Sequence, residues 1–161
     1  MKQIAWITFA LVALIVALPL AAQETPMTEE ELIALVRSDL QKDKVAIIGA
    51  AMSFSAEEAG KFWPIYKEYE SSLATVGDKR LTLIKDYAAN FMSMTDDKAG
   101  ELARTAMEIE QKRFDLKKQC FEKLATGVSP VIAARFLQVE NQLNLIVDLQ
   151  IAQELPLIER P

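Results

Sequence analysis

The feature that most constrains the fold is an aromatic stripe at helical spacing near the middle of the chain. Phe62, Tyr66 and Tyr69 follow one another at intervals of four and three residues, which places them on one face of a helix. Ser55 precedes the stripe as a helix cap, and Glu58 three residues later completes a capping box. Because aromatic side chains bury the most area per residue, this pattern predicts a helix that packs its aromatic face into the core.

We make separate predictions for two residues next to the stripe. Pro64 lies too far into the helix to be a first-turn proline, so we expect a lost hydrogen bond and a local bend there. Trp63 is rotated by about 100° from its neighbour in the stripe. The sequence leaves two roles open for it. Trp63 is either a partly exposed contact for a bound polypeptide, with Lys67 and Glu70 beside it, or it packs on the first helix or on the segment 45–48.

The first 22 residues have the pattern of a secretory signal peptide. Lys2 supplies the positive start, residues 4–18 are apolar, and Ala21-Ala22 precedes the expected cleavage site at Gln23. The apolar run is shorter than the roughly 20 residues that span a membrane. We therefore expect export to the periplasm, with an uncleaved membrane anchor as the alternative, and a single all-helical domain over residues 23–161.

The composition argues against most catalytic and nucleic-acid functions. The chain has 18 Lys and Arg, 23 Asp and Glu and no His, so its formal charge is −5, or −6 once residues 1–22 are removed. Without His, the commonest general base and metal ligand are missing, and an acidic chain lacks the basic stripe that binds nucleic acid. We expect no enzyme, no catalytic or metal site, no cofactor and no nucleic-acid partner. The lone Cys120 is expected to be a buried small hydrophobe.

The rest of the chain predicts helices throughout. No alternating β-branched run or hairpin turn is present, so the expected class is all-α: a long bent central helix in a small antiparallel bundle of about four helices. A first helix is expected over 29–42, and the segment 45–52 is ambiguous between a continuation and a separate turn. The central helix is expected to start after Ser55 and to run to about Met92, and Gly77 marks a bend or a close helix approach.

Two further helices are expected to start at Thr95 and at Ser129-Pro130 and to end at Gly127 and Leu155. The apolar stripes of these two helices and of the central helix predict which side chains are buried in the core. These are Phe62, Tyr66, Phe114, Phe136 and Leu143. The lower central helix should turn Leu81, Ile84, Tyr87, Ala88 and Phe91 inward. A leftover apolar flank predicts a homodimer, and it consists of Trp63, Leu83, Met107 and Leu116.

Three helix starts share one pattern: an apolar residue, a hydroxyl cap, then a helix. They are Phe54-Ser55 with Glu58, Met94-Thr95 and Val128-Ser129-Pro130. This pattern resembles the Leu-Thr-x-x-Gln motif of the Spy/CpxP family of periplasmic stress proteins. The fifth positions here are Glu58, Lys98 and Ile132.

The resemblance implies an ATP-independent chaperone that binds unfolded polypeptides, or a regulatory adaptor that reports to a membrane signalling protein. A structural accessory without a client is the third alternative. Spy-like proteins are dimers with a concave surface, and some members of the wider group bind metals through His, which this chain lacks. Met92 and Met94 are soft ligands that suit Cu(I), but Met is more often a core residue.

Overall fold

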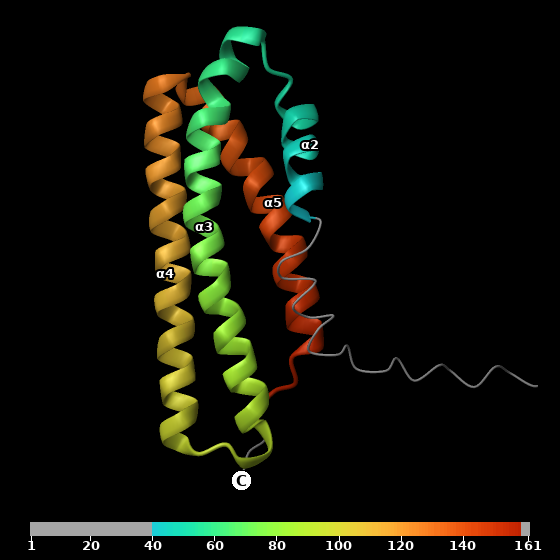
Figure 1. The fold of residues 1–161 in the computed structure, drawn as a ribbon, viewed down its shortest axis with the longest axis vertical. Helices are drawn as coiled ribbons and strands as arrows, with labels where there is room; N and C mark the ends of the chain where they lie inside the picture. The colour runs from blue at the N-terminus through green and yellow to red at the C-terminus, as the bar shows by residue number, and fades with distance from the viewer. Residues whose placement is uncertain (1–39, 159–161) are drawn as a thin grey trace, which may run out of the picture.

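The computed structural model describes residues 40–158 of the 161, with side chains from residue 44 onward. The described part is all-α and contains four α-helices and one 3-10 turn, in the order α2 (Leu40–Met52), α3 (Ala56–Asn90), η1 (Phe91–Ser93), α4 (Asp96–Gly127) and α5 (Pro130–Glu154) (Figure 1). The predicted fold class is therefore confirmed. The expected signal peptide and most of the expected first helix lie outside the described residues.

All three predicted helix caps are present. The Ser55 hydroxyl accepts from the Glu58 amide at 3.2 Å, and the Glu58 carboxylate accepts from the Ser55 amide at 2.8 Å, which completes the capping box of α3. Thr95 accepts from the Lys98 amide at 3.2 Å and so caps α4. Ser129 caps α5 in the same way, with proline in the first turn.

Of the two alternatives for the segment 45–52, the structure shows the continuation and not the separate turn, because α2 runs without a break from Leu40 to Met52. The helix therefore extends beyond the expected end at residue 42. It ends where Ser53 takes a left-handed conformation, with φ 51°. Ile48 and Met52 are fully or almost fully buried. Their burial outweighs the weak helix propensity of Gly49 inside the segment.

The long helices pack in sequence. Helix α3 lies against α4, α4 against α5, and α2 covers the half of α5 nearest the α4–α5 turn (Figure 1). No residue of α3 has its Cα atom within 8 Å of a Cα atom of α5. Large side chains fill the space between them: the rings of Phe62 and Phe136 lie 5.4 Å apart, and those of Tyr66 and Phe136 lie 5.9 Å apart. The side chains of the predicted aromatic stripe therefore pack between α3 and α5, whose backbones are widely spaced.

Four of the five predicted core residues are buried, namely Phe62, Tyr66, Phe136 and Leu143. The prediction for Phe114 is wrong, because its side chain is 62% exposed. The buried face of α4 is set by Ile109 and Cys120, and Phe114 comes five residues after Ile109. That spacing rotates it about 140° away from the buried face. The prediction that Cys120 is buried is confirmed.

The far half of α3 only partly follows the predicted stripe. Leu81 and Ile84 are buried, but Ala88 is exposed, which corrects that part of the prediction. A Cβ atom added to Gly77 would meet nothing within 4 Å, so no close helix approach requires this glycine. Pro64 lies inside α3 without ending it.

Within residues 40–158, none of the helices combines the length and the apolar character needed to cross a membrane.

Candidate functional site

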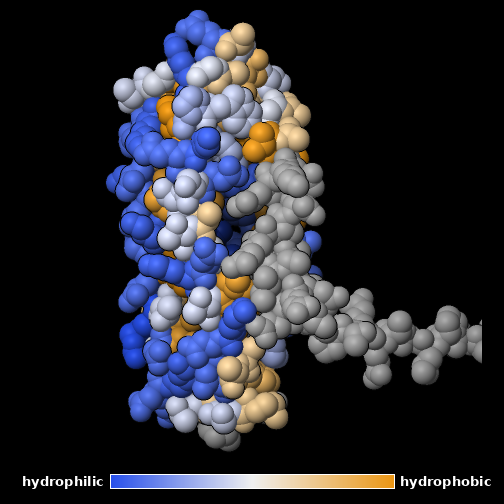
Figure 2. All heavy atoms as spheres, in the orientation of Figure 1, coloured by the Kyte–Doolittle hydropathy of each residue, from blue (hydrophilic) through white to orange (hydrophobic). Residues whose placement is uncertain are grey.

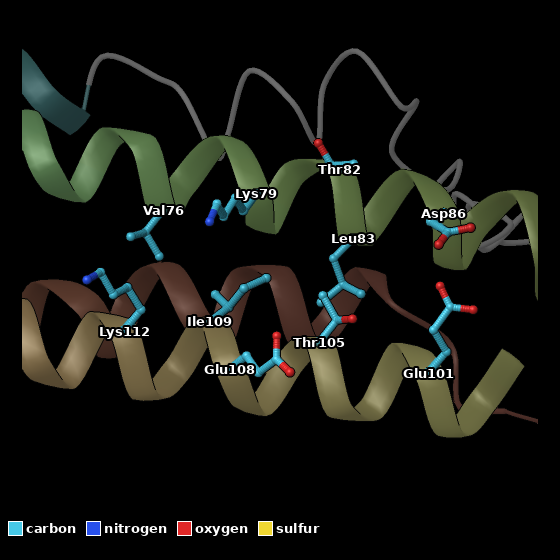
Figure 3. A pocket seen from close by; sticks show the side chains of 10 residues that line it. All are labelled: Val76, Lys79, Thr82, Leu83, Asp86, Glu101, Thr105, Glu108, Ile109 and Lys112. Atoms are coloured by element: carbon cyan, nitrogen blue, oxygen red, sulfur yellow. The ribbon is translucent and has the colours of Figure 1, made fainter. Parts of the chain in front are cut away.

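A groove of about 430 Å³ runs between α3 and α4, in the half of the hairpin away from the aromatic core (Figure 3). Val76, Leu83 and Ile109 supply its apolar residues, of which Leu83 is half-buried and the other two are buried. Thr82 and Thr105 add hydroxyl groups, and no residue of α5 lines it. The groove therefore has a narrow apolar floor, reached from solvent chiefly at Leu83, on the side of the hairpin away from α5.

Charged side chains border this floor. Lys79 and Lys112 stand at the end near Val76, one from each helix, while Asp86 and Glu101 stand at the opposite end (Figure 3). The ammonium of Lys98 donates to Asp86 at 2.7 Å and to Glu101 at 3.3 Å. The hydrogen bond to Asp86 is the main reason that the pKa of Lys98 is raised. An apolar strip with a charged border can hold an apolar segment and remain soluble.

The face of the molecule seen in Figure 2 is largely hydrophilic, and hydrophobic residues form small patches on it. Exposed apolar side chains also occur on α5, where Leu145, Ile146 and Leu149 are 69%, 54% and 58% exposed. Leu149 follows Leu145 by four residues and Ile146 by three, so the three side chains share one face of the helix, and none of them lines the groove.

The predicted contact residues Trp63, Lys67 and Glu70 lie elsewhere, on the half of α3 next to the aromatic core. Trp63 is half-buried, and its ring makes edge contacts with Phe62 at 5.1 Å and Tyr66 at 5.6 Å. A Cβ atom placed on Gly49 of α2 would lie 3.7 Å from the indole. The structure therefore packs one edge of the Trp63 ring against α2 at Gly49, and the half-buried ring keeps part of its surface exposed.

Lys67 and Glu70 differ in their surroundings. Lys67 is exposed, whereas Glu70 is half-buried and accepts a 3.3 Å hydrogen bond from the Tyr66 hydroxyl. The apolar residues before the caps also differ, since Phe54 packs on Phe62 at 4.5 Å while Met94 and Val128 are half-buried at the helix turns. The cap residues are thus parts of helix starts, and none lines the groove.

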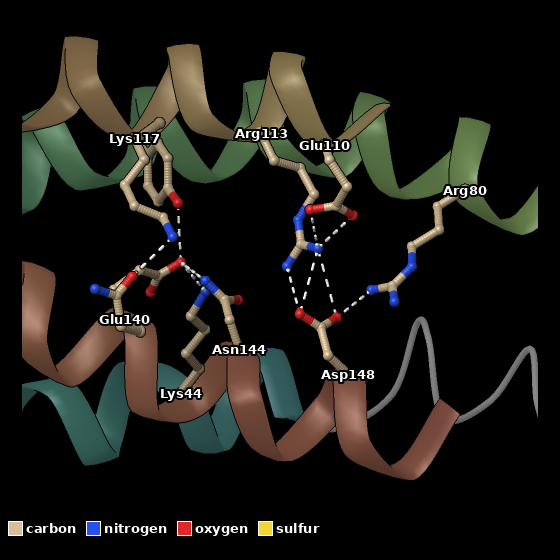
Figure 4. A network of polar contacts seen from close by, with 10 residues as sticks. Lys44, Arg80, Glu110, Arg113, Lys117, Glu140, Asn144 and Asp148 are labelled. Carbon is tan, nitrogen blue, oxygen red and sulfur yellow. Dashed lines mark hydrogen bonds and ion pairs between the residues drawn. The ribbon is translucent and has the colours of Figure 1, made fainter. Parts of the chain in front are cut away.

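A buried polar centre, which sequence reasoning missed, lies between α2, α3 and α5 (Figure 4). The side chain of Glu140 is 0% exposed, and its Oε1 atom accepts from Lys44 at 2.9 Å, from the Tyr69 hydroxyl at 2.9 Å and from Asn144 at 3.3 Å. Its Oε2 atom has no hydrogen-bond partner among the described residues. The signal was present in the sequence, because Glu140 follows Phe136 by four residues and so falls on the inward stripe of α5.

The groups around this carboxylate are hard to ionise. Burial, followed by the charge of Glu140, raises the pKa of the Cys120 thiol to about 12. Burial and then the charge of Glu140 also raise the pKa of Tyr69. The pKa of Tyr66 is raised by burial, then by the charge of Glu70 and then by that of Glu140. An un-ionised thiol is a poor nucleophile. The hydrogen bonds to Glu140 link α2, α3 and α5.

A second polar cluster joins the three long helices beyond Glu140 (Figure 4). Asp148 of α5 accepts from Arg80 of α3 at 2.6 Å and from Arg113 of α4 at 3.4 Å. Burial lowers the pKa of Arg113, but Asp148 and Glu110 outweigh it, so the net shift is upward. These charges hold α5 against the hairpin on the side away from the groove.

The described residues contain no group of three or more His, Cys, Asp and Glu that could hold a metal ion. The two methionines considered for Cu(I) are placed differently, since Met92 is 92% exposed and Met94 is half-buried.

Comparison of the chain with protein-family models, with curated proteins and with solved structures gives no match.

Proposed function

We propose that this protein binds unfolded polypeptide segments and limits their aggregation without ATP. The observation that carries the proposal is the α3–α4 groove, whose apolar floor is bordered by charges of both signs. Its volume of about 430 Å³ is within the range of roughly 300–1,000 Å³ that is usual for ligand sites. A floor of this kind takes apolar side chains from many sequences, because it makes few directional demands.

The sequence supports the same proposal. The expected signal peptide would bring the protein to the periplasm, and the capped helix starts resemble those of the Spy/CpxP stress proteins. The chain has no His and no glycine-rich phosphate loop, so the proposed activity needs neither nucleotide hydrolysis nor a cofactor. Export and family membership remain predictions.

A regulatory adaptor for one membrane signalling protein is the second candidate. The exposed patch of Leu145, Ile146 and Leu149 on α5 favours it, because a specific partner would cover such a patch. This function needs a single stoichiometric complex, whereas the chaperone function needs binding to unrelated unfolded chains.

An aggregation assay with several unrelated unfolded proteins tests the two candidates. The wild-type chain should suppress light scattering, and Leu83→Gln should weaken the suppression because Leu83 lines the groove. The matched control Leu145→Gln changes an exposed leucine outside the groove and should keep the activity. No suppression by the wild type, or an equal loss in the control, would contradict the proposal. Recovery of one partner at a fixed ratio would favour the adaptor.

A further inference from the structure

The charges bordering the groove are separated by sign along its length. Lys79 and Lys112 gather at the Val76 end from the two opposite walls (Figure 3). Neither ammonium forms an ion pair or hydrogen bond within residues 40–158. Both are exposed, so they are free to meet a negative group that enters this end.

The other end of the groove is negative. Asp86 and Glu101 share a single ammonium, that of Lys98, and Glu108 lies between the two ends (Figure 3). Carboxylates therefore outnumber ammonium groups there. A positive group entering at Asp86 and Glu101 would be attracted, and a negative one would be repelled.

The length of the groove limits what fits. Its lining residues on α3 run from Val76 to Asp86, which corresponds to roughly 15 Å at the helical rise. An extended chain of about five residues covers this distance. Alternate side chains of such a segment would point to the floor formed by Val76, Leu83 and Ile109.

We propose that the groove selects an extended segment with an apolar middle, an acidic residue at one end and a basic residue at the other. The acidic end lies between Lys79 and Lys112, and the basic end lies at Asp86 and Glu101. This inference rests on the proposed polypeptide binding and adds the chemistry of the segment that is bound. Because the contacts are exposed, each charged end should change the dissociation constant by about two- to fivefold.

Three labelled peptides test this selection. They share one apolar middle, have capped termini and differ only in the end residues, which are Glu and Lys, Glu and Glu, or Lys and Lys. Fluorescence anisotropy with the full chain should show the mixed peptide binding about two- to fivefold more tightly than either of the others. High salt should remove the difference, because exposed charges are screened.

Charge-reversal variants test whether the groove is the site of this selection. In the double variant Lys79→Glu with Lys112→Glu both ends are negative, so the Lys and Lys peptide should become the tightest ligand. The control double variant, Lys67→Glu with Lys118→Glu, makes the same change of charge on exposed positions of the same two helices. It should keep the preference for the mixed peptide. If charge reversal disturbs helix content, Lys79→Gln with Lys112→Gln should still abolish the preference for an acidic end.

Equal binding of the three peptides, or an unchanged preference in the groove variant, would overturn the selection. The proposed chaperone function would survive that result if the wild type still suppressed aggregation. A shift of preference in the control variant would overturn the placement in the groove. Absence of both peptide binding and aggregation suppression would overturn this inference and the proposed function together.

Discussion

Glu140 is the residue at which α2, α3 and α5 are tied together by hydrogen bonds. Lys44, Tyr69 and Asn144 all donate to its Oε1 atom, and the carboxylate is fully buried. Burying an ion pair costs desolvation energy, so the pair contributes little net stability as a whole. Removing one partner lowers the stability strongly, because it leaves the other charge buried and uncompensated.

This asymmetry gives a prediction. Lys44→Met should lower the free energy of unfolding by about 3–5 kcal/mol, because the Glu140 carboxylate loses its counter-charge. Glu140→Gln should cost less, since the amide oxygen can still accept from Tyr69 and the Lys44 side chain, already 13% exposed, can turn to water. Urea unfolding measures both. The control Lys61→Met removes an exposed pair and should change little. A larger loss in Glu140→Gln would contradict this account.

Cys120 should make the protein less stable in alkali. Burial raises the pKa of its thiol to about 12, whereas a thiol in the unfolded chain has a pKa near 8.5. Above about pH 8.5 the unfolded state therefore releases a proton that the folded state keeps. The free energy of unfolding should fall as pH rises, by up to about 1.4 kcal/mol per pH unit.

The window between about pH 8.5 and 10 isolates this effect, because tyrosines in the unfolded chain ionise near pH 10. Stability measured by urea unfolding across the window should have a smaller slope in Cys120→Ala than in the wild type. The same slope in both proteins would show that the thiol does not cause the loss.

At the scale of the helices, α2 is the α-helix whose backbone packs closely on only one other described helix, α5. Two of its side chains, Ile48 and Met52, are buried, and Arg135 of α5 donates to the Ala51 carbonyl at 3.0 and 2.7 Å from two nitrogen atoms. These bonds satisfy a carbonyl at the end of α2 that has no partner within the helix.

Arg135→Met should therefore loosen α2 selectively. Hydrogen exchange should become faster over residues 44–52 and stay unchanged in α3 and α4, because the hairpin does not depend on this contact. The control Lys118→Met changes an exposed cation on α4 and should leave α2 protected. Unchanged exchange over 44–52 in Arg135→Met would show that the bonds do not anchor the helix.

The elements show which parts of the structure the sequence could predict. The helix starts at Ser55, Thr95 and Ser129 were predictable because each cap acts locally on amides three residues away. The extent of α2 was not, because Gly49 weakens the local signal and packing on α5 decides the outcome. The exposure of Phe114 does not follow from its residue type, because its rotation of about 140° from Ile109 decides which side of α4 it occupies.

The candidate site was only partly predictable. The sequence offered Trp63, with Lys67 and Glu70 beside it, as a contact for a bound polypeptide on the central helix, and these residues do not line the groove between α3 and α4. The position of the groove depends on where α3 and α4 separate, and this is set by how the two helices pack. A local sequence pattern does not predict that packing.

At the scale of the whole molecule, the two ends of the bundle differ. The aromatic core and α2 occupy the end near the α4–α5 turn, and the groove occupies the other half of the hairpin (Figure 1). The stability of the fold and the proposed binding therefore depend largely on different residues. This separation is what allows groove variants to be tested without unfolding the protein.

The homodimer also remains a prediction at this scale. Of its expected flank, Met107 is 63% exposed, while Trp63, Leu83 and Leu116 are half-buried. Sedimentation at high micromolar concentration should show a dimer, and Met107→Glu should shift it towards monomer by placing a charge in the interface. A single monomeric species in the wild type would contradict the prediction.

The central claim is that an unfolded polypeptide lies in the α3–α4 groove, and a hydrogen-exchange footprint of the full chain tests it most directly. Exchange is compared with and without an unfolded client protein. The account predicts added protection over residues 76–86 and 101–112, which line the groove, with residues 63–70 and 145–149 unchanged. Protection confined to residues 63–70 or 145–149, with none in the groove segments, would contradict it.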